Sequence, residues 1–237
     1  MPQLSCRNLT IGYEGKAVLS DLSFTANAGD YICVAGENGS GKSTLLKTIV
    51  KLKAPIAGTI TTGDGLARKD IGYLPQQTAV QKDFPASVLE VVRSGCLNRS
   101  GLRPFYSKAE KQRADETMEK LGIASLARRC YRELSGGQQK RVFLARALCA
   151  AKKILLLDEP AAGLDPKAAA EMYALMKKQN DSGVTIIMIS HDMDIAARYA
   201  SHILHIGEER QLFFGTTAEY LESETGRAYA GLRGIEP

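Results

Sequence analysis

The sequence predicts an α/β fold whose core is a mixed, mostly parallel sheet, with an antiparallel β subdomain and an inserted helical subdomain. Three observations favour this fold class. Short apolar segments with the character of strands alternate with helical patterns along most of the 237 residues. Three of these segments precede the first helical pattern, which is typical of an antiparallel portion. Between residue 77 and about residue 149 no strand pattern is found, and helical stretches follow one another.

Strands are predicted where β-branched and other apolar residues form short runs bounded by glycine, proline or polar residues. These runs are 4–11, 18–26, 31–35, 58–62, 71–74, 153–158, 184–190, 203–206 and 211–214. The run 153–158 is almost wholly apolar before its final carboxylate, which indicates a parallel strand that is buried on both faces.

Helices are predicted over residues 45–50, 88–95, 108–121, 136–148 and 216–222. Ser87 and Ser107 each stand three residues before a glutamate, which is the pattern of a capping box at a helix start. Gly122 is expected to end the helix 108–121, because glycine adopts the left-handed conformation that closes a helix. After residue 222 we expect a frayed end.

No internal repeat, low-complexity tract or linker-like change in composition divides the chain. We therefore expect one domain over residues 1–237. Within it, residues 1–76 and 150–237 are expected to form the core with the β subdomain, and residues 77–149 the helical subdomain.

Composition indicates an ordinary globular chain, since hydrophobic residues make up 44% and charged residues 24% of it. No apolar run approaches the ~20 residues that cross a bilayer as a helix. The first residues carry charge and hydroxyl groups where a secretion signal needs an apolar core. The five cysteines show no CxxC spacing and are odd in number, so we expect a cytosolic chain with reduced thiols.

The net charge of +5 permits attraction to nucleic acid, acidic lipid headgroups or nucleotide phosphates, and does not choose among them. His202 and His205 form an HxxH pattern that could suggest a metal site. On a strand, however, the two rings would point to opposite faces, and the spacing of four zinc ligands is absent.

A glycine-rich segment follows the strand 31–35 and precedes a helix, and it matches the P-loop pattern GxxxxGK[ST]. Its glycines let successive backbone N–H groups turn toward one anion, and the helix N-terminus adds its dipole. Lys42 supplies a charge for the outer phosphates of ATP, and the Ser43 hydroxyl is suited to Mg²⁺. The alternative, a glycine-rich turn without function, is disfavoured by the complete motif in its required context. The residues expected to bind ATP here are Gly36, Asn38, Gly39, Ser40, Gly41, Lys42, Ser43 and Thr44.

Two carboxylates end the apolar strand 153–158, at the sheet edge where ligands bind in α/β proteins. Asp158 is suited to hold Mg²⁺ through water, and Glu159 to take a proton from an attacking water. Taken alone, this pair is equally compatible with an ordinary strand end. Together with the P-loop, it indicates ATP hydrolysis.

Ser135, Gly136, Gly137 and Gln138 follow Leu134 at the start of the helix 136–148. They form either a cap with a flexible turn or a second helix terminus able to receive an anion. This segment resembles the signature of the ABC superfamily of P-loop ATPases. A second phosphate-binding terminus makes physical sense if two copies face each other head to tail, each completing the site of its partner.

The resemblance covers the chain from Tyr13 to about Phe214 and implies further roles. It implies that Tyr13 stacks on adenine, although a lone tyrosine is also an ordinary edge-strand residue. It implies that Gln76 touches Mg²⁺ and the attacking water, with Gln77 as the alternative. It places Asp165 in the loop 162–165, which crosses the dimer interface in this family. It implies that His191 contacts the γ-phosphate, with an ordinary core histidine as the alternative. Ala161 departs from the family, in which many members carry threonine or serine.

Within the superfamily, a single ATPase unit without membrane spans or long heptad arms favours the motor of an importer. The segments 81–95 and 104–106 are similar to those of zinc and manganese importer ATPases, and iron-chelate importers for siderophores or haem are similar there. The partners implied are a second copy, integral membrane permease subunits and, indirectly, an extracytoplasmic binding protein, at the cytoplasmic face of the membrane. Phe84 and Val88 either line the docking groove for the permease or belong to the core of the helical lobe.

The opposing hypothesis is a soluble ABC ATPase that acts on nucleic acid. Its expected footprint is a basic stripe with interleaved aromatic residues. The closest candidate is the short run 128–132, which contains three arginines and a tyrosine. We interpret that run as a solvated face and expect no nucleic-acid partner.

Overall fold

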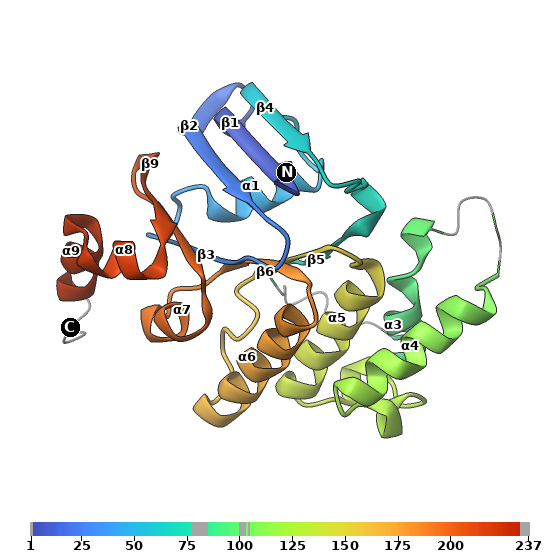
Figure 1. Cartoon of the computed structure of the whole chain (residues 1–237). Coiled ribbons are helices and arrows are strands. Elements are labelled where there is room, and N and C mark those ends of the chain that lie inside the picture. The colour runs from blue at the N-terminus through green and yellow to red at the C-terminus, as the bar shows by residue number, and fades with distance from the viewer. Residues whose placement is uncertain (1, 77–84, 100–102, 104, 233–237) are drawn as a thin grey trace. The chain divides into compact units, whose positions relative to one another are not determined.

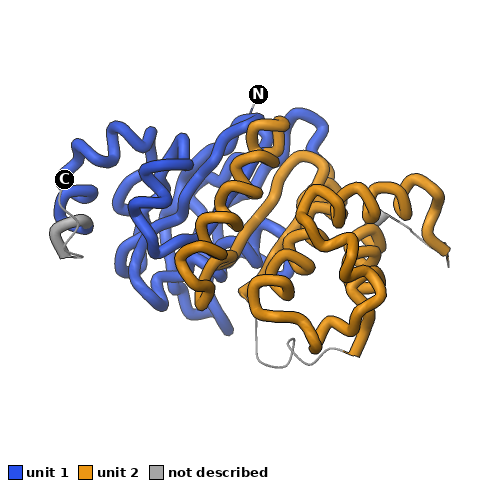
Figure 2. The backbone as a smooth tube through the Cα atoms, turned by 90° about the horizontal axis from the view of Figure 1, so that it is seen from below, with its two compact units in different colours: residues 1–66, 185–237 blue, residues 67–184 orange. Residues whose placement is uncertain are grey.

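The structure is a computed structural model that describes residues 2–76, 85–99, 103 and 105–232 (Figure 1). It divides into two compact units (Figure 2). The first unit comprises Met1–Leu66 and Thr185–Pro237, and the second comprises Ala67–Val184. None of the helices in the described ranges combines the length and the apolar character that a bilayer span requires.

The sheet of the first unit has the strand order β4-β1-β2-β9-β8-β3-β7. Strands β1 (Leu4–Tyr13), β2 (Lys16–Ala26) and β4 (Ala57–Thr62) form an antiparallel portion, in which Leu4 pairs with both Ala26 and Thr62. In the parallel portion, β3 (Tyr31–Gly36) lies between β7 (Thr185–Ile189) and β8 (His202–Ile206). The strand β9 (Glu209–Thr216) is antiparallel to β8 and parallel to β2.

Burial explains why these segments form strands. All six residues of β3 are buried, as expected of a central parallel strand covered on both faces. The helix α1 (Lys42–Ile49) follows β3 and buries Leu45, Leu46 and Ile49. The helices α7 (Met193–Tyr199), α8 (Thr217–Glu222) and α9 (Glu224–Leu232) contribute Met193, Ala196, Tyr220 and Tyr229 to one apolar cluster around Cys33.

In the second unit, β5 (Ile71–Leu74) runs parallel to β6 (Ile154–Asp158), with Leu74 opposite Leu157. The helix α5 (Gly136–Ala150) contacts β5, α3 (Val88–Ser94) and α4 (Lys108–Lys120). The helix α6 (Pro166–Asp181) follows β6. Short 3₁₀ turns, η1 (Arg68–Asp70), η2 (Leu97–Arg99), η3 (Ala124–Leu126) and η4 (Tyr131–Glu133), connect these elements.

The predicted fold class is confirmed, and each predicted strand is present with bounds that differ by up to two residues. The predicted capping boxes at Ser87 and Ser107 are present, and Gly122 closes α4 with a φ of 67°. The expected frayed end after residue 222 is wrong, because α9 continues the helical structure there and buries Tyr229. The division into a core and a helical subdomain over residues 77–149 stays a prediction.

Candidate active site

The P-loop connects β3 to α1, and its backbone conformation depends on glycine. Gly36 has a φ of 140°, and a Cβ added there would lie 2.1 Å from the carbonyl oxygen of Ile206 on the neighbouring strand β8. Gly39 and Gly41 also have positive φ angles, of 86° and 94°, and Gly41 is the residue that caps α1. Only glycine adopts this succession of angles without strain, and it turns the backbone N–H groups at the start of α1 toward one point.

Lys42 lies inside this loop and is 5% exposed. Its Nζ donates hydrogen bonds to the carbonyl oxygens of Gly36, at 3.0 Å, and of Glu37, and lies 3.5 Å from the hydroxyl of Ser40. The loop therefore gathers an ammonium group and a helix N-terminus in one cradle, which suits a polyphosphate. Asn38 is exposed at the tip of the loop, and Ser43 is half-buried on the first turn of α1.

Tyr13 ends β1 next to this helix. The hydroxyl of Thr44 donates a hydrogen bond to the Tyr13 hydroxyl at 3.0 Å, so the ring is fixed relative to the P-loop helix. The ring is 45% exposed, and Lys53 Nζ lies 3.1 Å from its centroid, in cation–π geometry. An exposed aromatic face beside the P-loop can stack on a base. Sequence reasoning did not identify Lys53, and no local motif marks it.

His191 lies at the same sheet edge as the P-loop. Strands β3 and β7 are parallel with Val34 opposite Ile189, so their carboxyl ends coincide, and His191 follows β7 by two residues. The Ser190 amide donates to the Val34 carbonyl at 3.4 Å, and the Asp192 side chain caps α7 at the Ile195 amide. These hydrogen bonds of Ser190 and Asp192 fix the backbone on both sides of His191, whose imidazole is half-buried.

His205 was singled out only as half of an HxxH pattern, and the structure buries it. Its Nδ1 lies 2.8 Å from the Tyr220 hydroxyl, and its ring packs edge-on against Tyr229 with centroids 4.6 Å apart. Burial, and secondarily the charge of Lys42, lower the pKa of His205 to about 4. This histidine is therefore neutral and belongs to the core behind the P-loop.

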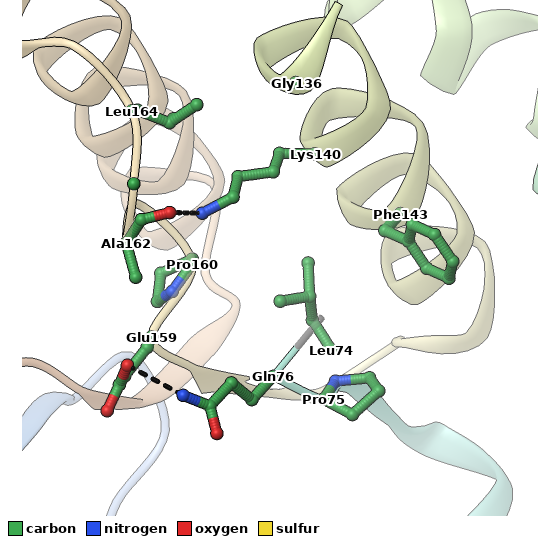
Figure 3. Close-up of a pocket in the computed structure, with 11 residues that line it drawn as sticks. Leu74, Pro75, Gln76, Gly136, Lys140, Phe143, Glu159, Pro160, Ala162 and Leu164 are labelled. Atoms are coloured by element: carbon green, nitrogen blue, oxygen red, sulfur yellow. Dashed lines mark hydrogen bonds between the residues drawn. The ribbon is translucent and has the colours of Figure 1, made fainter. Parts of the chain in front are cut away.

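In the second unit, β6 ends in the predicted carboxylates. Asp158 is 2% exposed, whereas Glu159 is half-buried and adopts a φ of 51°, which is unusual for a residue other than glycine. Gln76 Nε2 donates a hydrogen bond to Glu159 Oε2 at 3.1 Å (Figure 3). The parallel register of Leu74 with Leu157 explains this meeting, because each of the two residues lies two positions beyond that pair. Strained backbone of this kind is concentrated at functional sites.

The signature segment forms the N-terminus of α5. The Ser135 hydroxyl accepts a hydrogen bond from the Gln138 amide at 3.3 Å, and Gln138 Oε1 accepts one from the Ser135 amide at 3.1 Å. A Cβ added to Gly136 would meet nothing within 4 Å, and one added to Gly137 would meet only ordinary contacts at 3.9 Å and beyond. Neither glycine has a positive φ. The packing of the described residues therefore does not require glycine at either position.

Asp165 lies beside this helix terminus. Its Oδ1 accepts a hydrogen bond from the Ala168 amide at 2.9 Å and so caps α6. Asp165 and the segment from Ser135 to Gln138 line one open cavity of about 510 Å³, with Arg141 on its wall. The structure thus brings the predicted signature residues and Asp165 together.

The described residues contain no cluster of three or more His, Cys, Asp or Glu side chains that could hold a metal ion. A Mg²⁺ ion that arrives with a nucleotide needs fewer protein ligands, because phosphates and water complete its shell. The Ser43 hydroxyl, the Asp158 carboxylate and the Gln76 amide are oxygen donors of the kind that Mg²⁺ accepts. The alternative Gln77 and the docking candidate Phe84 lie outside the described residues, and Val88 is fully buried.

Comparison with known proteins gives one family. The model of the ABC transporter family matches residues 19–162. The chain is 39% identical to the manganese transport system ATP-binding protein MntB of Bacillus subtilis, over 94% of this chain and 91% of that protein. It is 35% identical to the zinc transport system ATP-binding protein TroB of Treponema pallidum, over 94% of this chain and 85% of that protein. A chain of a transporter assigned to the metal-chelate type of ABC transporters, solved in an inward-facing conformation, superimposes with a TM-score of 0.86 at 29% identity, covering 98% of this chain and 90% of that one.

Proposed function

The chain belongs to the ABC transporter family and is one of its ATPases, and from this premise we propose that it powers an importer of a divalent transition metal ion such as manganese or zinc. In this proposal it acts at the cytoplasmic face of the membrane, bound to integral permease subunits, while an extracytoplasmic protein delivers the ion. Two copies of the chain enclose two ATP molecules between them.

Each group of the site has a role in this proposal. Lys42 and the amides of the P-loop hold the phosphates, and Tyr13 stacks on adenine. Ser43, Asp158 and Gln76 would hold the Mg²⁺ ion that accompanies ATP, and the ion would neutralise charge on the phosphates. Glu159 takes a proton from the attacking water, and His191 contacts the γ-phosphate. These assignments rest on the P-loop geometry, on the hydrogen bond between Gln76 and Glu159, and on the family resemblance.

The observation that carries the shared site is the open space at Gly136. Gly136 is the first residue of α5, directly after the N-cap Ser135. A Cβ there would meet nothing within 4 Å, and φ is not positive, so nothing within the described chain requires glycine at this position. A bare backbone at a helix N-terminus suits close approach of an anion, yet the P-loop already uses α1 for this purpose. This supports a terminus that serves the ATP bound to a second copy.

Mixed dimers test this proposal. Lys42→Ala removes the charge on the phosphates, and Gly136→Asp adds a carboxylate where the anion approaches. When the two variants are co-assembled and isolated through two different tags, shared sites give one site with both lesions and one with neither. We expect such dimers to occlude ATP at about one site per dimer. Dimers that occlude no ATP, as sites confined to one chain require, would refute the shared site.

The metal is proposed from the relatives, one of which is a manganese and another a zinc transport ATP-binding protein. Uptake of radioactive manganese and zinc is measured in cells whose own gene for the chain is replaced by the Glu159→Gln variant. Loss of uptake of one of these ions, while uptake of a ferric siderophore or of haem is unchanged, supports the proposal. Loss of chelate uptake alone would assign the chain to an iron-chelate importer.

A soluble ATPase that acts on nucleic acid is the weaker alternative. In the run 128–132 the three arginines are exposed, but Tyr131 is fully buried and packs edge-on against Phe143. The aromatic residue of this run is therefore not available to stack on a base. Binding of nucleic acid that is strong and falls steeply with salt would revive the alternative.

A further inference from the structure

Lys140 links the signature helix to the loop that begins at Glu159. It lies on α5 one turn beyond Gly136, so the two residues share a face of the helix. Both line a cavity of about 200 Å³ whose opposite wall is the loop from Glu159 to Leu164 (Figure 3). Across this cavity, Lys140 Nζ donates a hydrogen bond to the carbonyl oxygen of Ala162.

The loop from Glu159 to Leu164, which accepts this bond, is held mainly by hydrogen bonds of its own backbone. The Ala162 amide donates to the Glu159 carbonyl at 3.2 Å, and the Leu164 amide to the Ala161 carbonyl at 3.1 Å. Ala161 is buried and has no hydroxyl that could hold the loop. The backbone of Ala162 thus donates through its amide to the Glu159 carbonyl and accepts at its own carbonyl oxygen from Lys140. A shift of α5 at Lys140 would therefore be transmitted to the turn that sets the Glu159 carboxylate.

We propose that Lys140 is a positioning residue that couples the two ATP sites of the dimer. The inference rests on the shared sites of the proposed function, in which the N-terminus of α5 contacts the ATP of the partner while Glu159 acts on the ATP of its own chain. The hydrogen bond between Lys140 and Ala162 then connects, inside one subunit, the signature helix α5 at the ATP of the partner with the loop of Glu159 at the ATP of its own chain. Arrival of ATP at the signature helix adjusts the position of Glu159 through this bond.

The test compares three variants at a protein concentration at which the wild-type chain dimerises with ATP. Lys140→Met keeps the length of the side chain and removes the donor, and Lys140→Arg keeps a donor. Lys177→Met is the matched control, because Lys177 is a half-exposed lysine of the same unit whose Nζ lies 2.7 Å from Asp181 on its own helix. For each variant the rate of ATP hydrolysis is measured against ATP concentration, and the melting temperature is recorded.

In Lys140→Met we expect kcat to fall about tenfold, the size of effect that one charge-assisted hydrogen bond produces when it holds the reacting geometry. The KM for ATP should stay within about twofold, and the Hill coefficient should fall from above one toward one. Lys140→Arg should restore both quantities, and Lys177→Met should change neither. A role limited to stability would lower the melting temperature without changing the Hill coefficient of the folded protein.

The proposal is overturned if Lys140→Met keeps the wild-type kcat and Hill coefficient, or if wild-type hydrolysis has a Hill coefficient of about one. It is also overturned if Lys140→Arg is as defective as Lys140→Met. Glu159→Gln separates this failure from failure of the proposed function. If that variant does not dimerise with ATP, the shared site itself is wrong, whereas dimerisation together with a wild-type Hill coefficient in Lys140→Met rejects the role of Lys140 alone.

Discussion

The side-chain amide of Gln76 donates a hydrogen bond to the carboxylate of Glu159, with 3.1 Å between Nε2 and Oε2. This bond holds the Glu159 carboxylate in place, where it can take a proton from an attacking water. Gln76→Glu would instead bring two carboxylates together, and their repulsion would displace the Glu159 side chain. We expect the kcat of this variant to fall about a hundredfold while ATP is still bound.

Gln76→Met is the control for this experiment, because it removes the hydrogen bond without adding a charge. Its kcat should fall less than that of Gln76→Glu. A wild-type kcat in Gln76→Glu would show that the position of the Glu159 carboxylate does not limit the reaction.

Glu159→Gln should bind ATP and lose hydrolysis by about a hundredfold or more, since the amide keeps the shape of the side chain but cannot accept the proton. ATP binds the dimer without being consumed, so dimers should accumulate. Size-exclusion chromatography with and without ATP measures the dimer, and release of phosphate measures turnover. Hydrolysis at the wild-type rate would reject Glu159 as the base.

Tyr13→Ala should weaken ATP binding by about tenfold, because base–aromatic stacking contributes about 1–3 kcal/mol. Tyr13→Phe removes only the hydroxyl that accepts the bond from Thr44, and it should retain most of the affinity. Titration with ATP and with inorganic tripolyphosphate separates the base from the phosphates. The tripolyphosphate affinity should be equal in all three proteins, and an equal loss for both ligands would contradict stacking.

Two glycines should respond in opposite directions to alanine. The Cβ of Gly36→Ala would lie 2.1 Å from the Ile206 carbonyl oxygen, so the backbone would have to shift to relieve the clash. The free energy of unfolding should therefore fall by about 1–3 kcal/mol. The Cβ of Gly136→Ala meets no neighbour within 4 Å, and since Gly136 is the first residue of α5 and not an interior one, the variant should raise that free energy by at most about 0.5 kcal/mol while weakening ATP occlusion. Urea denaturation measures both. A destabilised Gly136→Ala protein would mean that its own fold needs the glycine.

His205 makes stability depend on pH. The unfolded chain takes up a proton at this imidazole near its ordinary pKa of 6.5, whereas the folded chain does so only at about 4. The unfolded state therefore binds more protons between these values, and the free energy of unfolding falls as the pH falls through this window. From about pH 7 to about pH 5 the loss from His205 should be about 2 kcal/mol. In His205→Gln this part of the loss should be missing from urea denaturation curves, and equal pH dependence in both proteins would contradict burial of a neutral imidazole.

Much of the fold was predictable because its signals are local. The buried strands are continuous apolar runs, as in β6, and the helix starts at Ser87 and Ser107 carry their own capping partners. The helix α9 was missed, since its nine residues contain two glycines. Its docking depends instead on Tyr229, which packs on His205 from 24 positions earlier in the chain. Tertiary contacts of this kind leave no pattern within the helix itself.

In the candidate site, too, the features with a local motif were predictable and those that depend on tertiary contacts were not. The P-loop is nine consecutive residues, so its chemistry can be read directly from the sequence. The meeting of Gln76 with Glu159 depends on the pairing of β5 with β6, and a sequence alone does not say which strands are neighbours. The contact of Lys53 with Tyr13 spans 40 positions and follows a turn in which Lys51 has a φ of 58°, which residue type does not predict.

The open space at Gly136 also makes this position suitable for a spectroscopic label. The Cβ of a cysteine introduced there would meet no atom of its own chain within 4 Å. Cys6, Cys33, Cys96 and Cys149 are buried, and burial raises the pKa of Cys6 and Cys33 to about 12, so a maleimide dye would leave them unmodified. Only the half-exposed Cys130 needs replacement beforehand. A fluorophore at position 136 would then fill the space that the partner's ATP is proposed to enter, so a labelled chain that no longer associates would report which surface a second copy needs.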